Sequence, residues 1–109
     1  MISSFFGELT IGPGVHAIRT EVMEILTAGV TQGKKVKLII DLSQCTDIDS
    51  TGLAELTRSC AAVVQNGAVV HVCGPQSGVL LGMIRAKFAE VWEVHEDLES
   101  AKHGIKAQR

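Results

Sequence analysis

Residues 36–53 of this chain, VKLIIDLSQCTDIDSTGL, predict a strand, a loop and the start of a helix in succession. The first seven of them, Val36 to Leu42, are almost continuously aliphatic, which is typical of a strand covered on both faces of a sheet. A polar loop over residues 43–49 follows, and residues 50–66 then place apolar side chains at helical spacing until Gly67 ends the pattern. A buried strand that leads through a loop into a helix is typical of α/β folds.

The same alternation extends in both directions from this stretch. Strands are predicted at residues 5–11, 36–42, 68–73 and 91–94, and helices at residues 16–30, 50–66, 76–87 and from 97 onward. The apolar residues of the first helix fall on one face: Ile18, Val22, Ile25, Leu26 and Gly29. Strands separated by helices of this length pair in parallel through right-handed crossovers. We therefore expect an α/β fold with a four- to five-stranded mixed, mainly parallel sheet and about four helices.

Composition limits the classes of function open to the chain. Its 109 residues, 46% apolar and 20% charged, suffice for one folded domain, which we take to be residues 1–109. The formal net charge of −2 offers no basic surface for nucleic acid. No apolar run is long enough for membrane insertion and the first residues lack a secretory signal, so we expect a cytoplasmic protein. The 3 cysteines have neither the spacing of a disulfide framework nor that of a zinc site.

The start of the second predicted helix is the most informative part of the sequence. Asp49 or Ser50 can cap this helix, which leaves Thr51 in its first turn with an outward hydroxyl. The unpaired N–H groups of a first turn and the helix dipole favour an added anion there. Gly52 has no side chain, so another protein could approach the Thr51 hydroxyl closely. The alternative is that these residues are simply a helix cap beside a solvated loop.

The segment from Asp41 to Leu53 matches the pattern D-x-S-x-x-x-x-x-D-S-S/T-G-L, which resembles the signature of STAS domains, the anti-sigma factor antagonists and related modules of sulfate transporters. Other segments extend the resemblance over about residues 5–104: Gly7-Glu-Leu9, Val70–Gly74 and Asp97–Ala101. The motif residues are identified with partner binding by this resemblance: Asp41, Ser43, Asp49, Ser50, Gly52 and Leu53.

The resemblance also implies a function. In anti-sigma factor antagonists, which are bacterial regulators of transcription, the hydroxyl residue before the motif glycine is phosphorylated by the anti-sigma factor, itself a serine/threonine kinase. The matching residue here is Thr51, where serine is common in the antagonists. We therefore expect a non-catalytic phosphoprotein without a cofactor or metal. A phosphatase of the PP2C type could remove the phosphate from Thr51. An accessory subunit of a phospholipid-trafficking ABC transporter, or a stress-signalling scaffold, is the alternative within the family.

Further expectations concern packing, capping and the edge of the sheet. Asp41 should hydrogen-bond N–H groups of the loop, with Ser43 involved, and Ile48 should point inward and anchor the loop. Ser77 could cap the third helix, which should bury Leu80, Met83 and Ile84. Trp92 should pack near the sheet edge. The family has a strand before the G-E-L segment, whereas here only residues 1–4 precede Phe5. Either this first strand is very short, or the sheet edge is open. An open edge could bind a partner or a second copy in a homodimer.

Other chemistries find less support in the residues. Asp41 ends an apolar strand as a receiver aspartate does, but the first strand is not followed by the acidic pair that holds a receiver's magnesium ion. A hydrolase built on Ser43, Cys45 or Ser50 lacks the G-x-S-x-G elbow. The glycine-rich turn over residues 74–78 lacks the ending of a P-loop. His71 and Cys73 share a strand face, where buried packing is the expected role.

Overall fold

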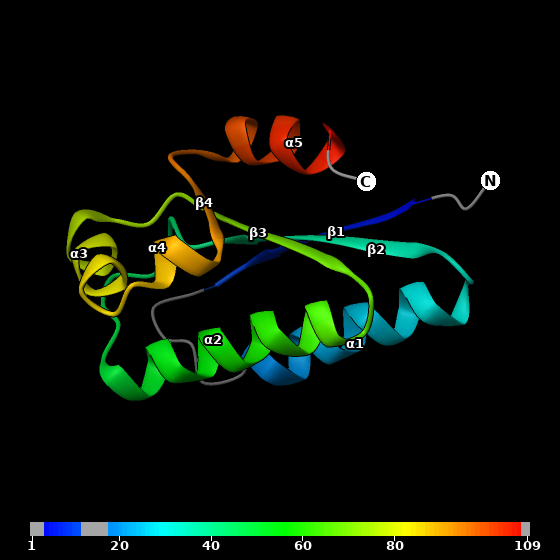
Figure 1. The fold of residues 1–109 in the computed structure, drawn as a ribbon, viewed down its shortest axis with the longest axis horizontal. Helices are drawn as coiled ribbons and strands as arrows, with labels where there is room; N and C mark the ends of the chain where they lie inside the picture. The colour runs from blue at the N-terminus through cyan, green and yellow to red at the C-terminus, as the bar shows by residue number, and fades with distance from the viewer. Residues whose placement is uncertain (1–3, 12–17, 108–109) are drawn as a thin grey trace.

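The computed structural model describes residues 4–11 and 18–107. Within these ranges the chain forms four strands and five helices (Figure 1). In chain order they are β1 (Ser4–Thr10), α1 (Ile18–Thr31), β2 (Lys35–Asp41), α2 (Ser50–Gln65), β3 (Val69–Cys73), α3 (Ser77–Arg85), α4 (Phe88–Val91), β4 (Glu93–His95) and α5 (Leu98–Ala107). The predicted turn at residues 12–14 and the predicted helical residues 16 and 17 lie outside the described residues.

The four strands form one sheet in the order β1-β2-β3-β4, and each neighbouring pair is parallel. This confirms the expected α/β class, while the antiparallel pairing of a mixed sheet does not occur among the described strands. Register places Thr10 beside Asp41, Asp41 beside Cys73 and Cys73 beside His95. The carboxyl ends of all four strands therefore meet at one end of the sheet, where α/β folds place their functional sites.

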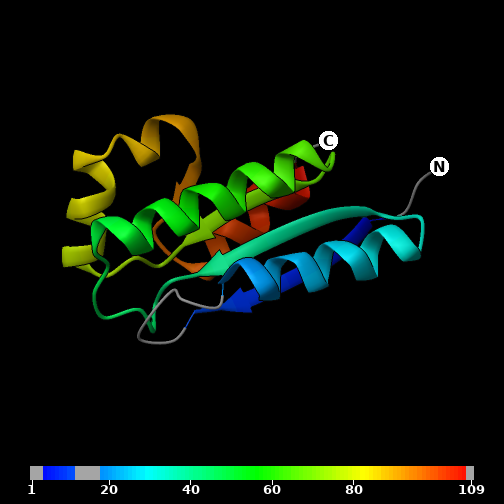
Figure 2. The same cartoon turned by 90° about the horizontal axis from the view of Figure 1, so that it is seen from below.

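Helices cover both faces of the sheet. α1 and α2 lie side by side on one face, and α5 lies on the other (Figures 1 and 2). α3 lies beyond the carboxyl ends of the strands, at the end of the molecule where α2 begins. Because β2 and β3 lie in the middle of the sheet, they are covered on both sides, as their continuous apolar sequences predict.

The side chains of β2 alternate between two buried clusters, as the two-residue period of a strand requires. Leu38 and Ile40 are fully buried with the apolar stripes of α1 and α2. Ile39 points the other way and packs with Ala101 and Ile105 of α5. At about 25 cal/mol per Å² of apolar surface, burial of such side chains supplies most of the force that holds the helices on the sheet.

The amphipathic pattern of α2 agrees with its packing. Leu56, Cys60 and Val63 are buried, Leu53 is half-buried, and Val64 lies on the exposed side. No helix in the described part of the chain is both long and apolar enough to cross a membrane.

Expectations for the segment after β3 were partly wrong. Ser77 does not cap α3: Gln76 occupies the cap position without a side-chain hydrogen bond to the helix, and Ser77 is the first helical residue. α3 contacts the core through Val79 and Met83, which lie one turn apart, while Leu80 is half-buried and Ile84 is 56% exposed. The reason is that α3 lies across the end of the sheet, so only a narrow stripe of it meets other elements.

The last strand is also shorter and later than its prediction of residues 91–94. It covers Glu93–His95, and the one-turn helix α4 takes up Val91. α4 follows Lys87, whose φ of 60° lies in the left-handed region and turns the chain back toward the sheet. Trp92 is half-buried against the core with its ring 6.3 Å from that of Phe88, in agreement with its expected packing role.

Candidate partner-binding site at the start of helix α2

The loop between β2 and α2 is tied at its first residues to the end of the sheet. An oxygen of the Asp41 carboxylate accepts a hydrogen bond of 2.9 Å from the Ser43 N–H, which confirms the expectation for these two residues. Gly74, after the neighbouring strand β3, adopts a φ of 68° beside them. A Cβ on Gly74 would lie 3.3 Å from the Asp41 carboxylate, so a side chain there would crowd the turn as well as strain the backbone.

Three further contacts fix the middle of this loop. Cys45 is fully buried, and its Sγ donates to the Asp47 carbonyl at 3.3 Å. Ile48 is half-buried and packs against the core, which confirms that it anchors the loop. The Gln76 side-chain amide donates to the Ser43 carbonyl at 2.9 Å, so the segment before α3 also holds the loop in place. The sequence does not reveal this role of Gln76, because a hydrogen bond to a distant main-chain carbonyl leaves no local pattern.

Asp49 is the N-cap of α2, one of the two residues considered for that position. Its backbone is extended, with φ −93° and ψ 178°, and its carboxylate accepts a 2.7 Å hydrogen bond from the Gly52 N–H. Its carbonyl accepts the first helical hydrogen bond, 2.9 Å from the Leu53 N–H. Ser50 and Thr51 are therefore the first two helical residues, and their N–H groups have no acceptor within the helix.

Thr51 is exposed at this helix start, as are Asp49 and Ser50, whereas Gly52 is buried. Thr51 is thus open to solvent in the first turn of α2, while the next residue is buried. The positive end of the helix dipole lies at the same place, and it stabilises an exposed anion by about 0.3–1 kcal/mol.

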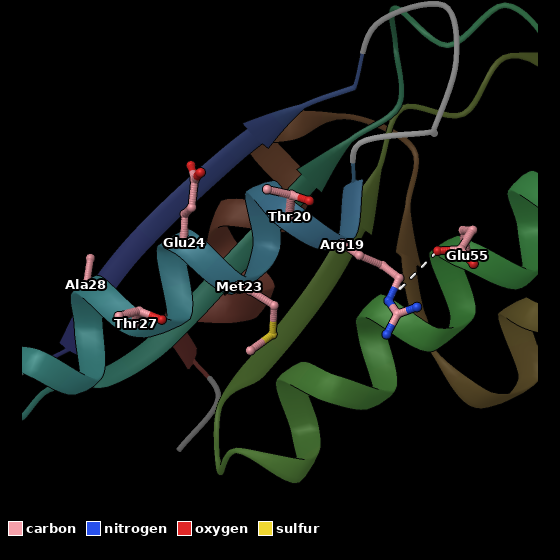
Figure 3. Close-up of a pocket in the computed structure, with 7 residues that line it drawn as sticks. All are labelled: Arg19, Thr20, Met23, Glu24, Thr27, Ala28 and Glu55. Atoms are coloured by element: carbon pink, nitrogen blue, oxygen red, sulfur yellow. Dashed lines mark ion pairs between the residues drawn. The ribbon is translucent and has the colours of Figure 1, made fainter.

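An open groove of about 860 Å³ runs between α1 and α2 next to this helix start. Figure 3 shows Arg19 and Met23 of α1 pointing toward α2, where Glu55 is one helical turn after Thr51. The Glu55 carboxylate lies 3.1 Å from the Arg58 guanidinium and 3.9 Å from that of Arg19. This cluster ties α1 to α2 on the surface, although such exposed pairs contribute only about 0–1 kcal/mol each to stability.

Helix α3 packs against the loop before this helix start and exposes two large apolar side chains. Leu81 is 48% exposed and Ile84 is 56% exposed. α3 lies against the loop that carries the site, because a Cβ on Gly82 would lie 3.8 Å from the Ile48 side chain. Exposed apolar side chains beside a polar helix start are typical of a protein-binding surface.

The cysteines of the chain are not activated. Burial raises the pKa of the Cys45 thiol, and it raises those of Cys60 and Cys73 to about 12. Because the thiolate is the nucleophile, these thiols stay protonated and unreactive at neutral pH. Among the described residues no group of three or more His, Cys, Asp or Glu side chains could hold a metal ion.

A pair of histidines lies under α5, on the face of the sheet opposite α2. His71 is buried, as expected, and its Nδ1 lies 2.9 Å from Nε2 of His95, with the two rings stacked at 5.0 Å. Gly104 of α5 packs directly on them, since a Cβ there would lie 2.8 Å from the His95 ring. Burial, and then the nearby His71, lower the pKa of His95. The sequence could not reveal this pair, because its members lie on different strands.

The match to a family model decides the identity of the fold. The STAS domain model matches residues 11–101, which include the whole motif from Asp41 to Leu53. The chain belongs to the STAS domain family. No curated protein matches this STAS domain in sequence.

Solved structures of the same fold agree with this assignment. A candidate anti-sigma factor antagonist from Thermotoga maritima, TM1081, superposes in its crystal structure with a TM-score of 0.71 at 17% identity, over 97% of this chain and 92% of the other. The NMR structure of TM1081 gives 0.73 at 13% identity, over 93% and 82%. A sulfate transporter family protein from Wolinella succinogenes gives 0.75 at 18% identity, over 93% and 84%. At these identities the likeness concerns the STAS fold.

Proposed function

We propose that this STAS domain is an anti-sigma factor antagonist, which binds a kinase-type anti-sigma factor through the surface around Thr51 and is released when Thr51 is phosphorylated. The observation that carries the proposal is the exposure of Thr51 in the first turn of α2, immediately before the buried Gly52. A kinase can reach this oxygen without unfolding the domain. The other motif residues support it: Asp41 orders the turn that leads to the helix, and Asp49 caps the helix itself.

Phosphorylation of Thr51 adds a charge of about −1.5 to −2 at neutral pH. Within the domain this charge meets the first-turn N–H groups and the positive end of the helix dipole, so the free fold tolerates it. Asp47 and Asp49, which come four and two residues before Thr51, are exposed carboxylates of the same sign. The phosphate therefore remains hydrated in the free domain.

A partner packed over Thr51 must remove that water. An unpaired buried charge costs several kcal/mol, and a loss of only about 1.4 kcal/mol weakens binding tenfold. Apolar side chains of α3 that are exposed to a partner, Leu81 and Ile84, supply no group that could pair with a phosphate. Phosphorylation thus acts on the interface and leaves the fold of the domain unchanged.

Binding of the purified kinase to Thr51→Glu and Thr51→Ala variants tests the proposal. Titration calorimetry should show at least tenfold weaker binding for Thr51→Glu than for Thr51→Ala, which should bind like the native domain. Thr57→Glu is the matched control, because Thr57 is also exposed on α2 but its hydroxyl already donates to the Leu53 carbonyl on another side of the helix. Equal binding by both Thr51 variants would remove the proposal.

A role in transport is the second candidate function, because the same STAS fold also occurs in a sulfate transporter family protein. In that case the domain would serve as an accessory subunit of a phospholipid-trafficking ABC transporter, or as a stress-signalling scaffold. Purification of the tagged domain from its native cells distinguishes the two. Recovery of a kinase-fold protein, with phosphothreonine at Thr51 in mass spectra, supports sigma-factor regulation, whereas recovery of an ABC ATPase supports the transporter role.

A further inference from the structure

Strand β1 forms one edge of the sheet, and the described residues place no strand beside its outer side. The Ile11 N–H donates to the Asp41 carbonyl of β2, so Gly7, Leu9 and Ile11 turn their main-chain groups inward. Main-chain groups alternate along a strand. The N–H and C=O groups of Phe6 and Glu8 therefore point away from the sheet, where a further strand could bind them.

The side chains of the same residues line a groove on the α5 face of the sheet. Gly7 faces α1, since a Cβ there would lie 2.7 Å from the Ile25 side chain, so Phe6 and Glu8 face the other way. Phe6 is 52% exposed. The groove measures about 330 Å³, and its walls combine one acidic with two basic residues: Phe6, Gly7, Glu8, Ile39, Lys102, Ile105 and Lys106.

We propose that two copies of this chain pair through β1 in antiparallel orientation, about a two-fold axis that passes by Gly7. This register brings Phe6 of each copy directly opposite Glu8 of the other. Both residues carry outward main-chain groups, so each of the two pairs exchanges two hydrogen bonds. Two four-stranded sheets become one continuous sheet, and both unpaired edges disappear.

Charge complementarity selects a second copy as the occupant of this edge. A two-fold axis perpendicular to the sheet keeps the α5 helices of both copies on one face. The Glu8 carboxylate of one copy then lies next to Phe6 of the other, beside the groove that Lys102 and Lys106 line. The exchange occurs twice by symmetry, so each Glu8 carboxylate lies on the side of the other copy that carries the α5 lysines. The edge also lacks the outward lysine or proline that blocks self-association in many proteins.

The start of α2 stays accessible in such a dimer. α2 packs on β3 and α1 packs on β1 and β2, so Thr51 belongs to the part of the domain away from the paired edge. A dimer could therefore present two copies of the proposed partner-binding surface. The pairing does not depend on that proposed function, because it concerns other residues and needs no kinase.

Sedimentation velocity on the 109-residue chain over a range of concentrations measures the pairing. Glu8→Lys should weaken the dimer at least tenfold, because it places a lysine against Lys102 and Lys106. The matched control is Glu90→Lys, the same charge change at an exposed residue of α4, which should leave the dimer unchanged. The triple variant Glu8→Lys, Lys102→Glu, Lys106→Glu should recover the affinity.

Cross-linking tests the register itself. Residues opposite each other in a hydrogen-bonded antiparallel pair have Cα atoms about 5.5 Å apart, a distance that suits a disulfide. A mixture of Phe6→Cys and Glu8→Cys chains should therefore form mixed disulfide dimers in air, while neither variant should do so on its own. The native cysteines are buried and do not interfere. The proposal would be overturned if the chain stayed monomeric at all concentrations up to about 1 mM. It would also be overturned if Glu8→Lys left the dimer intact, or if a monomer bound only extended peptides at this edge.

Discussion

Replacement of Asp49 by alanine would test whether this one side chain holds the start of α2 in place. The substitution removes the 2.7 Å hydrogen bond from the Gly52 N–H to the carboxylate, leaving that part-buried donor unsatisfied. Loss of an N-cap side chain costs about 0.5–2 kcal/mol, and the lost interaction of a negative charge with the helix dipole is included in that range. We take about 1–1.5 kcal/mol, because the bond is short and charge-assisted. For a domain of this size each kcal/mol lowers Tm by about 4–8 °C.

Urea unfolding followed by far-UV circular dichroism measures this cost. The midpoint should fall while the slope with urea stays constant, since the native surface is unchanged. Asp49→Asn should lose less than half as much, because asparagine is an equally good N-cap acceptor without the charge. Asp47→Ala is the matched control, an exposed carboxylate in the same loop, and should shift stability by less than about 0.5 kcal/mol. If Asp47→Ala costs as much as Asp49→Ala, or if Asp49→Ala costs nothing, the account of the helix start is wrong.

Three further predictions concern the opposite face of the sheet and the core. Burial and His71 lower the pKa of His95 below its ordinary value of 6.5, so near and below that pH the unfolded chain binds more protons than the folded domain. The free energy of unfolding should therefore decrease as pH falls below about 6.5. Urea titrations at several pH values should show a flatter pH profile for a His95→Gln variant. Gly104→Ala should destabilise the domain by about 1–3 kcal/mol, because its Cβ would overlap the His95 ring. The control Gly78→Ala, whose Cβ meets open space, should be neutral or slightly stabilising. Thermal unfolding compares the two variants, and equal Tm values would contradict the close packing of α5. Cys60, whose pKa burial raises to about 12, should react with a thiol reagent at pH 8 only as fast as the domain unfolds, and rapid labelling of the native protein would contradict its burial.

Local sequence signals were sufficient where neighbouring residues determine the structure. Asp41 and Ser43 lie two positions apart, so their hydrogen bond could be expected from the turn chemistry of aspartate. Asp49, Thr51 and Gly52 fall within one turn of a helix, and a cap followed by an outward hydroxyl follows from their order. Partner binding by these residues remains a proposal.

Sequence signals failed where contacts between distant segments determine the structure. Ile84 was expected in the core on its helical spacing, but α3 lies across the end of the sheet and only Val79 and Met83 reach the interior. Ser77 is a good cap by type, yet the helix starts one residue too early for it to act. The bond of Gln76 to the Ser43 carbonyl spans segments that meet only after β2 and β3 have paired.

The sequence by itself determined the α/β class, the covered central strands and the start of α2, because hydrophobic periodicity and capping act over a few neighbouring residues. Only the tertiary structure decided which residues meet across the sheet: the stacked pair of His71 and His95 beneath Gly104, the α1–α2 groove, and the outward main-chain groups of Phe6 and Glu8. These features depend on strand order and on the register between strands. Both result from packing of the whole chain, since a one-residue shift in register would turn each side chain to the opposite face.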